Sequence, residues 1–265
     1  MSAPAQSEQA EPARTSQGWY VYGIVPGDVE STGEAAGVGD PPARVEVLPH
    51  GDIAALVSEV DVSKPLGKPE DVLAHQQLLD ATVAEAPVLP MRFGAVVSDK
   101  DAVVDELLAP HEEEFAAALR ELEGRAEFVI KGRYVQDAVL REVLSEDAEA
   151  AQLRDEIRQT GDEDASRNAR IRLGEIISNA IEAKREADTR QLGDAVAAYS
   201  ISSNVRPPTH EEDAVHVALL VEMAKRDDLE QAVGKLAQDW KGRVNLRLLG
   251  PMAAYDFVVA QRPED

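Results

Sequence analysis

The sequence contains no cysteine among its 265 residues. This absence excludes disulfide bonds, thiolate metal sites and thiol nucleophiles, and it is consistent with a reducing compartment. Aromatic residues are also scarce, at 4% of the chain, whereas apolar residues as a whole make up 44%. We therefore expect hydrophobic cores that are built mainly from valine, leucine, isoleucine and alanine.

The sequence also lacks the segments by which proteins enter or cross membranes. No run of apolar residues is long enough for a transmembrane helix, so we expect none. The opening stretch, residues 1–17, has no basic region followed by an apolar run and does not match a secretory signal. Because it is rich in alanine, proline, serine and glutamate, we interpret it as a disordered tail. We expect a cytoplasmic protein.

Positive charge is in short supply. The chain has 27 lysines and arginines against 50 aspartates and glutamates, which gives a formal net charge of −23. A field of that sign repels phosphate backbones and anionic lipid surfaces. The basic residues form no run longer than two, so we expect neither nucleic-acid binding nor membrane binding.

The motifs that identify common classes of enzyme are missing as well. There is no GxxxxGK[ST] phosphate loop and no GxSxG nucleophile turn, and Gly37 and Gly39 lack the third glycine of a dinucleotide site. The acidic residues cluster in consecutive runs, which splay around a helix or loop instead of facing each other across a pocket. The histidines form no HExxH or HxH pair; they are His50, His75, His111, His210 and His216. We predict no enzyme activity, cofactor, metal site or small-molecule substrate.

The length and the order of elements predict an α+β protein with two domains. We place an N-terminal α+β domain at residues 18–124 and a C-terminal domain at residues 125–265. In the first domain we expect strands at 19–26, 44–48, 53–60 and 88–97 and a helix at 70–85. The strand at 88–97 is expected to be central and interrupted at Pro90. Two helices should follow, the first capped by Ser98 or Asp99 and the second separated from it by Pro110.

The second half of the chain has the element order of a ferredoxin-like domain. Residues 137–198 are almost wholly helical apart from a break at Thr160-Gly161-Asp162, which predicts a long charged helical hairpin inserted in the first crossover. A helix at 227–241 is expected to begin with Asp227 as its N-cap. The expected strands are at 126–135, 199–205, 214–223 and 244–249.

Several segments of the chain resemble the GvpL/GvpF family of gas vesicle proteins. They are YVYGIVP at 20–26, GDIAALVSEV at 51–60, HQQLLDATVAEAPVLPMRFGAVV at 75–97, AVHVALLVEM at 214–223 and GRVNLRLLGPMAAYDFV at 242–258. The resemblance extends from about Trp19 to Ala260. Its most specific parts are VLPMRFG and LLGPMAAYDFV. The charged region 145–190 resembles the family in its expected helical structure more than in its amino-acid sequence.

The resemblance implies a minor protein of the gas vesicle, a gas-filled protein shell made in the cytoplasm. Members of the family are linked to vesicle assembly, bind the small hydrophobic major shell protein and have been placed at the gas-facing surface. The family implies an α+β N-terminal domain and a modified ferredoxin-like C-terminal domain. A dry apolar lumen is a poor environment for a chain with a charge of −23, so we favour an assembly role over permanent residence at that face, although a wetted inner surface would remove this objection.

An assembly role suggests a mechanism and candidate contacts. An apolar shell subunit would aggregate unless its exposed surfaces or strand edges were covered, and an acidic protein could cover them through a sheet edge or a groove. Our candidate partner contacts are Arg92 and Phe93, beside Pro90, and Tyr255 and Phe257, near the end of the chain. Ordinary core packing is the competing interpretation of each aromatic residue.

Two alternative functions remain open at this point. The chain could be an adaptor or regulatory module that binds other gas vesicle accessory proteins through the charged helical hairpin. It could also be a small-molecule enzyme with a ferredoxin-like domain, in which case a polar pocket with a perturbed titratable group is expected.

Overall fold

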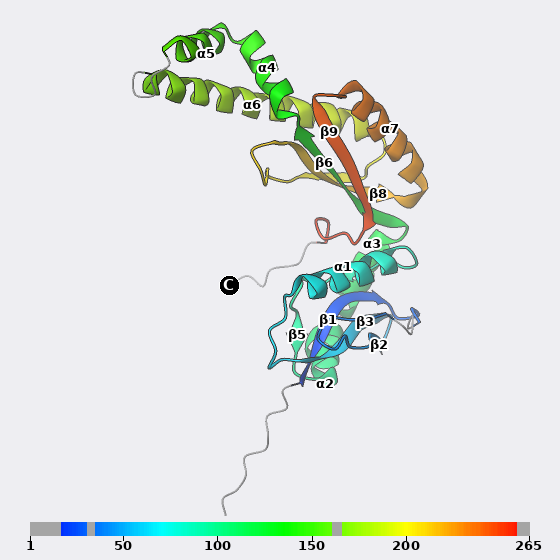
Figure 1. Ribbon diagram of the computed structural model, residues 1–265. Coiled ribbons are helices and arrows are strands. Elements are labelled where there is room, and N and C mark those ends of the chain that lie inside the picture. The colour runs from blue at the N-terminus through cyan, green and yellow to red at the C-terminus, as the bar shows by residue number, and fades with distance from the viewer. Residues whose placement is uncertain (1–16, 31–34, 161–165, 259–265) are drawn as a thin grey trace, which may run out of the picture. The chain divides into compact units, whose positions relative to one another are not determined.

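The computed structural model describes residues 17–30, 35–160 and 166–258. The first sixteen residues of the disordered tail predicted at 1–17 lie outside these residues, and Gln17 already belongs to a strand. Of the helix break predicted at Thr160-Gly161-Asp162, Thr160 ends a helix and the other two residues lie outside the described part. The chain divides into two compact units (Figure 1). The first unit contains the chain up to Leu79 together with Met91–Ala117, and the second contains Asp80–Pro90 and the chain from Ala118 onward. The domain boundary expected after residue 124 stays a prediction.

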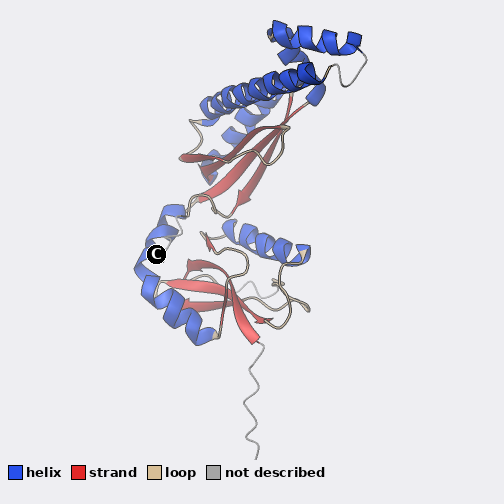
Figure 2. Cartoon of the chain, turned by 90° about the vertical axis from the view of Figure 1, so that its left-hand side faces the viewer, coloured by secondary structure: helices blue, strands red, loops and turns tan. Residues whose placement is uncertain are grey.

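The N-terminal part of the chain forms an antiparallel sheet with the strand order β2-β3-β1-β4, in which β5 also pairs with β1. The strands are β1 (Gln17–Pro26), β2 (Glu46–His50), β3 (Ile53–Asp61), β4 (Leu89–Pro90) and β5 (Val96–Val97). Strands β2 and β3 form the expected hairpin. Strands β1 and β3 are buried along nearly their whole length, because helices lie on both sides of the sheet (Figure 2).

The prediction that residues 88–97 form the central strand was wrong. Only β4 and β5 are in strand conformation there, and the central position belongs to β1. Proline has no backbone N–H to donate, so Pro90 cannot continue a strand that is bonded on both sides. The segment between β4 and β5 instead lies along β1. The N–H of Met91 donates to the carbonyl of Tyr22 at 2.8 Å, and the carbonyl of Ala95 accepts from the N–H of Val21 at 2.9 Å.

Helix α1 (Pro69–Val83) is followed by a longer helical run made of α2 (Lys100–Ala102), a π-helical turn (Val103–Leu108) and α3 (Ala109–Leu122). Asp99 caps this run as expected, since its carboxylate accepts from the N–H of Ala102 at 2.8 Å. The predicted separation at Pro110 was wrong. The wider π turn just before Pro110 accommodates the missing N–H and the ring, so the helix continues.

The second unit contains a fully antiparallel sheet in the order β7-β8-β6-β9. Its strands are β6 (Arg125–Tyr134), β7 (Ser202–Val205), β8 (Asp213–Glu222) and β9 (Val244–Met252). Its helices are α4 (Gln136–Glu146), α5 (Ala148–Thr160), α6 (Arg167–Val196) and α7 (Arg226–Asp239). Strand β9 runs through the cis Gly250-Pro251 bond, although the strand was expected to stop before it.

One face of the second sheet packs against α6 and α7. Side chains alternate between the two faces of a strand, and every second residue of β6, β8 and β9 belongs to the same core. The strands contribute Phe128, Ile130, Val217, Leu219 and Val244 among others, and the helices contribute Leu192, Val196, Leu229, Val233 and Leu236. On the opposite face, the carboxylate of Glu127 accepts from the N–H of Asp256 at 2.9 Å, so the segment that follows β9 contacts that face.

Two helix starts in the second unit differ from the expectation. Asp227 does not cap α7, because a 3-10 turn at Met223–Lys225 leads directly into the helix and puts Asp227 in its first turn. There its charge still suits the helix dipole. The region expected to be one helical arm is interrupted at Asp147. The carboxylate of Asp147 accepts from the N–H of Ala150 at 2.9 Å, and α5 begins at the next residue.

No helix among the described residues is long and apolar enough to cross a membrane.

Candidate functional site

Strand β7 is the most accessible edge of the second sheet. All four of its residues are exposed, and it pairs only with β8 among the described residues. The N–H of Arg206 donates to the carbonyl of His216 at 2.8 Å, directly after the strand. Since hydrogen-bonded pairs alternate in an antiparallel ladder, the backbone groups of Ser203 and Val205 face away from β8. They form a short unpaired edge.

The other edge strands carry features that discourage pairing with a further strand. Edge strands in soluble proteins are commonly blocked by proline or by charged side chains. Strand β9 contains Arg247 and Pro251, and strand β2 contains Glu46 and Pro49. Strand β7, with the sequence Ser-Ser-Asn-Val, contains neither a proline nor a charge. It is therefore the better suited of the two edges of the second sheet to accept another strand.

Apolar side chains accompany this edge. Val205 is 60% exposed and Ile201, just before the strand, is 45% exposed. Val205 also lines a groove of about 550 Å³ between the edge and α6. Val205, Pro207, Pro208 and Val215 form its apolar lining, and Arg185, Glu186, Thr189, Arg190, Arg206, Asp213 and His216 form its polar lining. An apolar side chain from an added strand could enter this groove.

The loop that follows β7 is held in place by Asp213. Its carboxylate accepts hydrogen bonds from the N–H groups of Thr209 and His210 and from the hydroxyl of Thr209, at 2.8–2.9 Å. Burial alone would raise the pKa of Asp213, but these bonds keep that pKa below its usual value. Arg185 on α6 donates to the backbone carbonyl of Asp213 at 2.8 Å, which joins the loop to the other wall of the groove.

The base of the edge is held by an ionic cluster. Arg206 donates to the carboxylates of Asp256 and Glu127, both at 2.7 Å. The amide of Asn204, within β7, also donates to Asp256 at 3.1 Å. Burial raises the pKa of Glu127 despite the neighbouring Arg206. The cluster ties β7 and β6 to the segment that follows β9, so the position of the edge depends on contacts that are distant in sequence.

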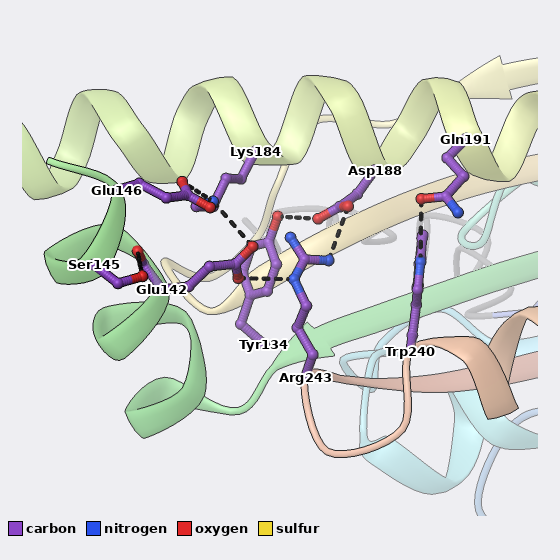
Figure 3. A network of polar contacts seen from close by, with 9 residues as sticks. All are labelled: Tyr134, Glu142, Ser145, Glu146, Lys184, Asp188, Gln191, Trp240 and Arg243. Atoms are coloured by element: carbon purple, nitrogen blue, oxygen red, sulfur yellow. Dashed lines mark hydrogen bonds and ion pairs between the residues drawn. The ribbon is translucent and has the colours of Figure 1, made fainter.

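A second polar network fixes α6 against the sheet (Figure 3). The hydroxyl of Tyr134, at the end of β6, donates to the carboxylate of Asp188 on α6 at 2.6 Å. Arg243 bridges Asp188 and Glu142 on α4, at 2.9 and 2.8 Å. Lys184 bonds Glu142 at 3.0 Å and extends the network along α6. Burial, followed by the bond to Asp188, raises the pKa of Tyr134, so the phenol stays protonated and remains a donor.

The four predicted contact residues do not gather at this site. Phe93 lies in the first unit, where its ring packs edge-on against Tyr20 and His75 at centroid distances of 5.9 and 5.7 Å. Its neighbour Arg92 is exposed. Tyr255 is 38% exposed and Phe257 is partly buried, both in the second unit. Their role as contacts stays a prediction.

Sequence reasoning missed the β7 edge. The segment from Ile201 to Val205 was expected to be a strand, but its exposure could not be read from its residues. The available signal was the combination of apolar residues at 201 and 205 with no charge or proline between them.

Among the described residues, no group of three or more histidine, aspartate or glutamate side chains is placed to hold a metal ion.

Comparison with known proteins identifies the family. The sequence profile described as "Gas vesicle synthesis protein GvpL/GvpF" matches residues 18–259. The chain belongs to the GvpL/GvpF family. A relative named gas vesicle protein F from a Streptomyces species is 34% identical over 242 residues, which cover 90% of this chain and 98% of the relative. Another from Dolichospermum flosaquae is 25% identical over 240 residues.

Solved structures of GvpF share the fold. The crystal structure of GvpF from Anabaena sp. PCC7120 superposes with a TM-score of 0.74 at 22% identity, covering 90% of this chain and 97% of that one. The structure of GvpF from Microcystis aeruginosa superposes with a TM-score of 0.72 at 20% identity, covering 91% and 98%. Membership of the GvpL/GvpF family supports a role connected with gas vesicles, and the family is not a known enzyme family.

Proposed function

We propose that this chain supports gas vesicle formation by binding the hydrophobic major shell protein through the β7 edge. The observation that carries this proposal is an exposed, uncharged edge strand beside a partly apolar groove. A strand of the partner would pair with the backbone of Ser203 and Val205. Every second side chain of that strand would then point toward the groove.

The charge of the chain is compatible with this role. An apolar shell subunit exposes surfaces that aggregate, and covering a strand edge removes one route to aggregation. A carrier with a net charge of −23 repels other copies of itself and keeps the complex in solution. The proposed place of action is the cytoplasm, where the subunit is delivered to a growing vesicle.

The second unit is proposed to be a ferredoxin-like domain with an enlarged first crossover. The supporting observation is its element order, in which three helices (α4, α5 and α6) lie between β6 and β7 and one helix (α7) lies between β8 and β9. The sheet order β7-β8-β6-β9, with all neighbours antiparallel, is the order that this topology requires. The helices α4 to α6 would form the inserted helical arm.

The test is a binding assay with purified major shell protein and two edge variants. Ser203→Pro puts a ring in the path of an added strand without removing a bond to β8, and Val205→Lys adds a charge to the edge. Both are expected to weaken binding at least about tenfold while leaving the far-UV circular dichroism unchanged. Ile171→Lys is the matched control, because it adds the same charge at an exposed apolar residue away from the edge, on α6, and should bind normally.

Full binding by both edge variants would refute the proposed surface. The earlier candidates Arg92, Phe93, Tyr255 and Phe257 provide the comparison, and an alanine variant of Arg92 or Tyr255 that loses binding would move the contact to that residue. Absence of any binding by the unmodified chain, together with normal vesicles in cells that lack it, would refute the assembly role.

A second candidate is an adaptor that binds other gas vesicle accessory proteins through the helical arm. One observation favours it: Ile171, 54% exposed, lies on the part of α6 that pairs with α5 through Arg172 and Glu149 at 2.8 Å. Deleting residues 145–190 would remove Asp188 and Lys184 and damage the core. The better variant is Ile171→Glu with Arg172→Ala. Loss of accessory-protein binding with shell-protein binding retained would support the adaptor.

A further inference from the structure

A row of basic side chains crosses the face of the second sheet opposite α6 and α7. Lys131, in β6, lies opposite His216 in β8 and opposite Arg247 in β9. All three project from the face that does not pack on α6 and α7, because the core residues occupy the alternate positions. Lys131 and Arg247 are exposed, and His216 is partly exposed.

These charges are not neutralised within the part of the chain that the structure describes. Lys131 and Arg247 form no ion pair with a described residue. The acidic groups on or beside the same face are engaged elsewhere: Glu127 and Asp256 bind Arg206, and Asp213 pairs with Arg133 at 3.5 Å. Burial, followed by the charges of Lys131 and Arg206, lowers the pKa of His216 below its usual value, so His216 is mostly neutral at neutral pH and the charges of the row are those of Lys131 and Arg247.

Such a row is costly in isolation and unusual in this chain. Like charges directly opposite each other on neighbouring strands destabilise a sheet. Acidic residues outnumber basic ones by 50 to 27, so a cation could easily have been matched by an acid here. Positions that break a local rule without compensation are expected where a partner binds.

We infer that this row is a docking surface for an acidic helix of a partner protein that lies across the strands. Neighbouring strands are about 4.8 Å apart, so Lys131 and Arg247 leave their strands at roughly that spacing. Carboxylates four residues apart on a helix are about 5–6 Å apart, whereas alternate residues of an extended strand are about 6.6 Å apart. The helical spacing matches the row. Leu249, 41% exposed in the neighbouring row, offers an apolar contact beside it.

The direct test uses a labelled alanine-rich peptide of about 20 residues with glutamate at every fourth position, and the same peptide with glutamine instead. Fluorescence anisotropy at low ionic strength measures its affinity for the full chain. Lys131→Gln and Arg247→Gln are each expected to weaken binding about two- to fivefold, and the double variant more. Lys235→Gln, at an exposed lysine on α7, is the matched control and should bind normally.

A second measurement separates docking from a structural role. If the row is kept for a partner, Lys131→Gln should raise the Tm of the free protein by about 1–3 °C while it weakens peptide binding. A row that stabilised the fold would instead lose stability on the same substitution, and that result would overturn the inference.

Three other outcomes would also overturn it. The first is equal affinity for the glutamate and glutamine peptides, or unchanged binding by the double variant. The second is binding to phosphatidylserine vesicles that depends on Lys131 and Arg247, which would make the surface a lipid contact. The third is a concentration-dependent dimer that the double variant abolishes, which would make the occupant a second copy of this chain.

Discussion

The guanidinium group of Arg206 lies 2.7 Å from the carboxylate of Asp256, fifty residues further along the chain. The same nitrogen lies 2.7 Å from the carboxylate of Glu127, which is almost fully buried. Arg206 follows the exposed strand β7, and Asp256 belongs to the segment that follows β9. One side chain therefore connects the candidate edge, the central strand and the end of the described chain.

Replacing Arg206 should strongly destabilise the protein. Arg206→Ala leaves the buried carboxylate of Glu127 without its counter-ion, and breaking a buried ion pair on one side costs about 3 kcal/mol. Urea unfolding measures the loss. Arg226→Ala breaks an exposed pair with Glu230 and is the control, with an expected loss below about 1 kcal/mol. Equal losses for the two variants would contradict the role of the cluster.

The hydroxyl of Tyr134 should contribute more to the free energy of unfolding than that of an ordinary surface tyrosine. Tyr134→Phe removes a 2.6 Å hydrogen bond to the buried carboxylate of Asp188 and should lower the free energy of unfolding by about 1–2 kcal/mol. Tyr199→Phe is the control, since the hydroxyl of Tyr199 bonds no described residue. Thermal and urea unfolding report both. A neutral Tyr134→Phe would mean that Arg243 alone satisfies Asp188.

The two halves of α6 should differ in their contribution to stability. Leu192 is fully buried in the core between α6 and the sheet, whereas Ile171 is 54% exposed on the same helix. Leu192→Ala should cost about 3–4 kcal/mol, because it removes buried apolar surface and leaves a cavity. Ile171→Ala should cost less than about 1 kcal/mol. A large effect at Ile171 would show that the outer half is covered in solution.

Stability should fall as the pH is lowered below about 6.5, partly because of His75. His75 is buried, and its Nδ1 lies 2.9 Å from the hydroxyl of Tyr20. Burial lowers the pKa of His75 below its ordinary value of 6.5. The unfolded chain therefore takes up a proton near pH 6.5, and the folded chain only at lower pH. The contribution of His75 to the free energy of unfolding is complete above pH 6.5 and is lost progressively below it.

The measurement is urea unfolding at pH 7.5 and pH 5.5. The loss on going to the lower pH should be smaller in His75→Gln than in the unmodified chain, since one proton-linked group has been removed. Gln76→Ala, at an exposed residue of the same helix that does not titrate, should leave the loss unchanged. His216, whose pKa is also lowered, first by burial, contributes in the same direction and accounts for part of what remains. An identical pH dependence in His75→Gln would contradict the assignment.

Local patterns were sufficient for most individual elements. The alternation of apolar residues from Val215 to Val221 predicted β8, and the apolar stripe containing Leu229, Val233 and Leu236 predicted α7. Both patterns depend on the burial of one face, which residue spacing records directly. The absence of cysteine and the excess of acid likewise followed from the residues alone. The errors occurred at Pro90, where pairing with the distant strand β1 decides, and at Pro110, where a π-helical turn lets the helix continue.

The candidate site could not be predicted in the same way. Whether Ser202–Val205 is an inner or an edge strand depends on which strands pair, and the order β7-β8-β6-β9 joins segments that are far apart in sequence. The row of basic side chains has the same origin, because residues 131, 216 and 247 become neighbours only through register. The sequence by itself determined composition, charge and local periodicity. Only the tertiary structure decided which edge stays open and which charges meet, since strand pairing is set by long-range packing.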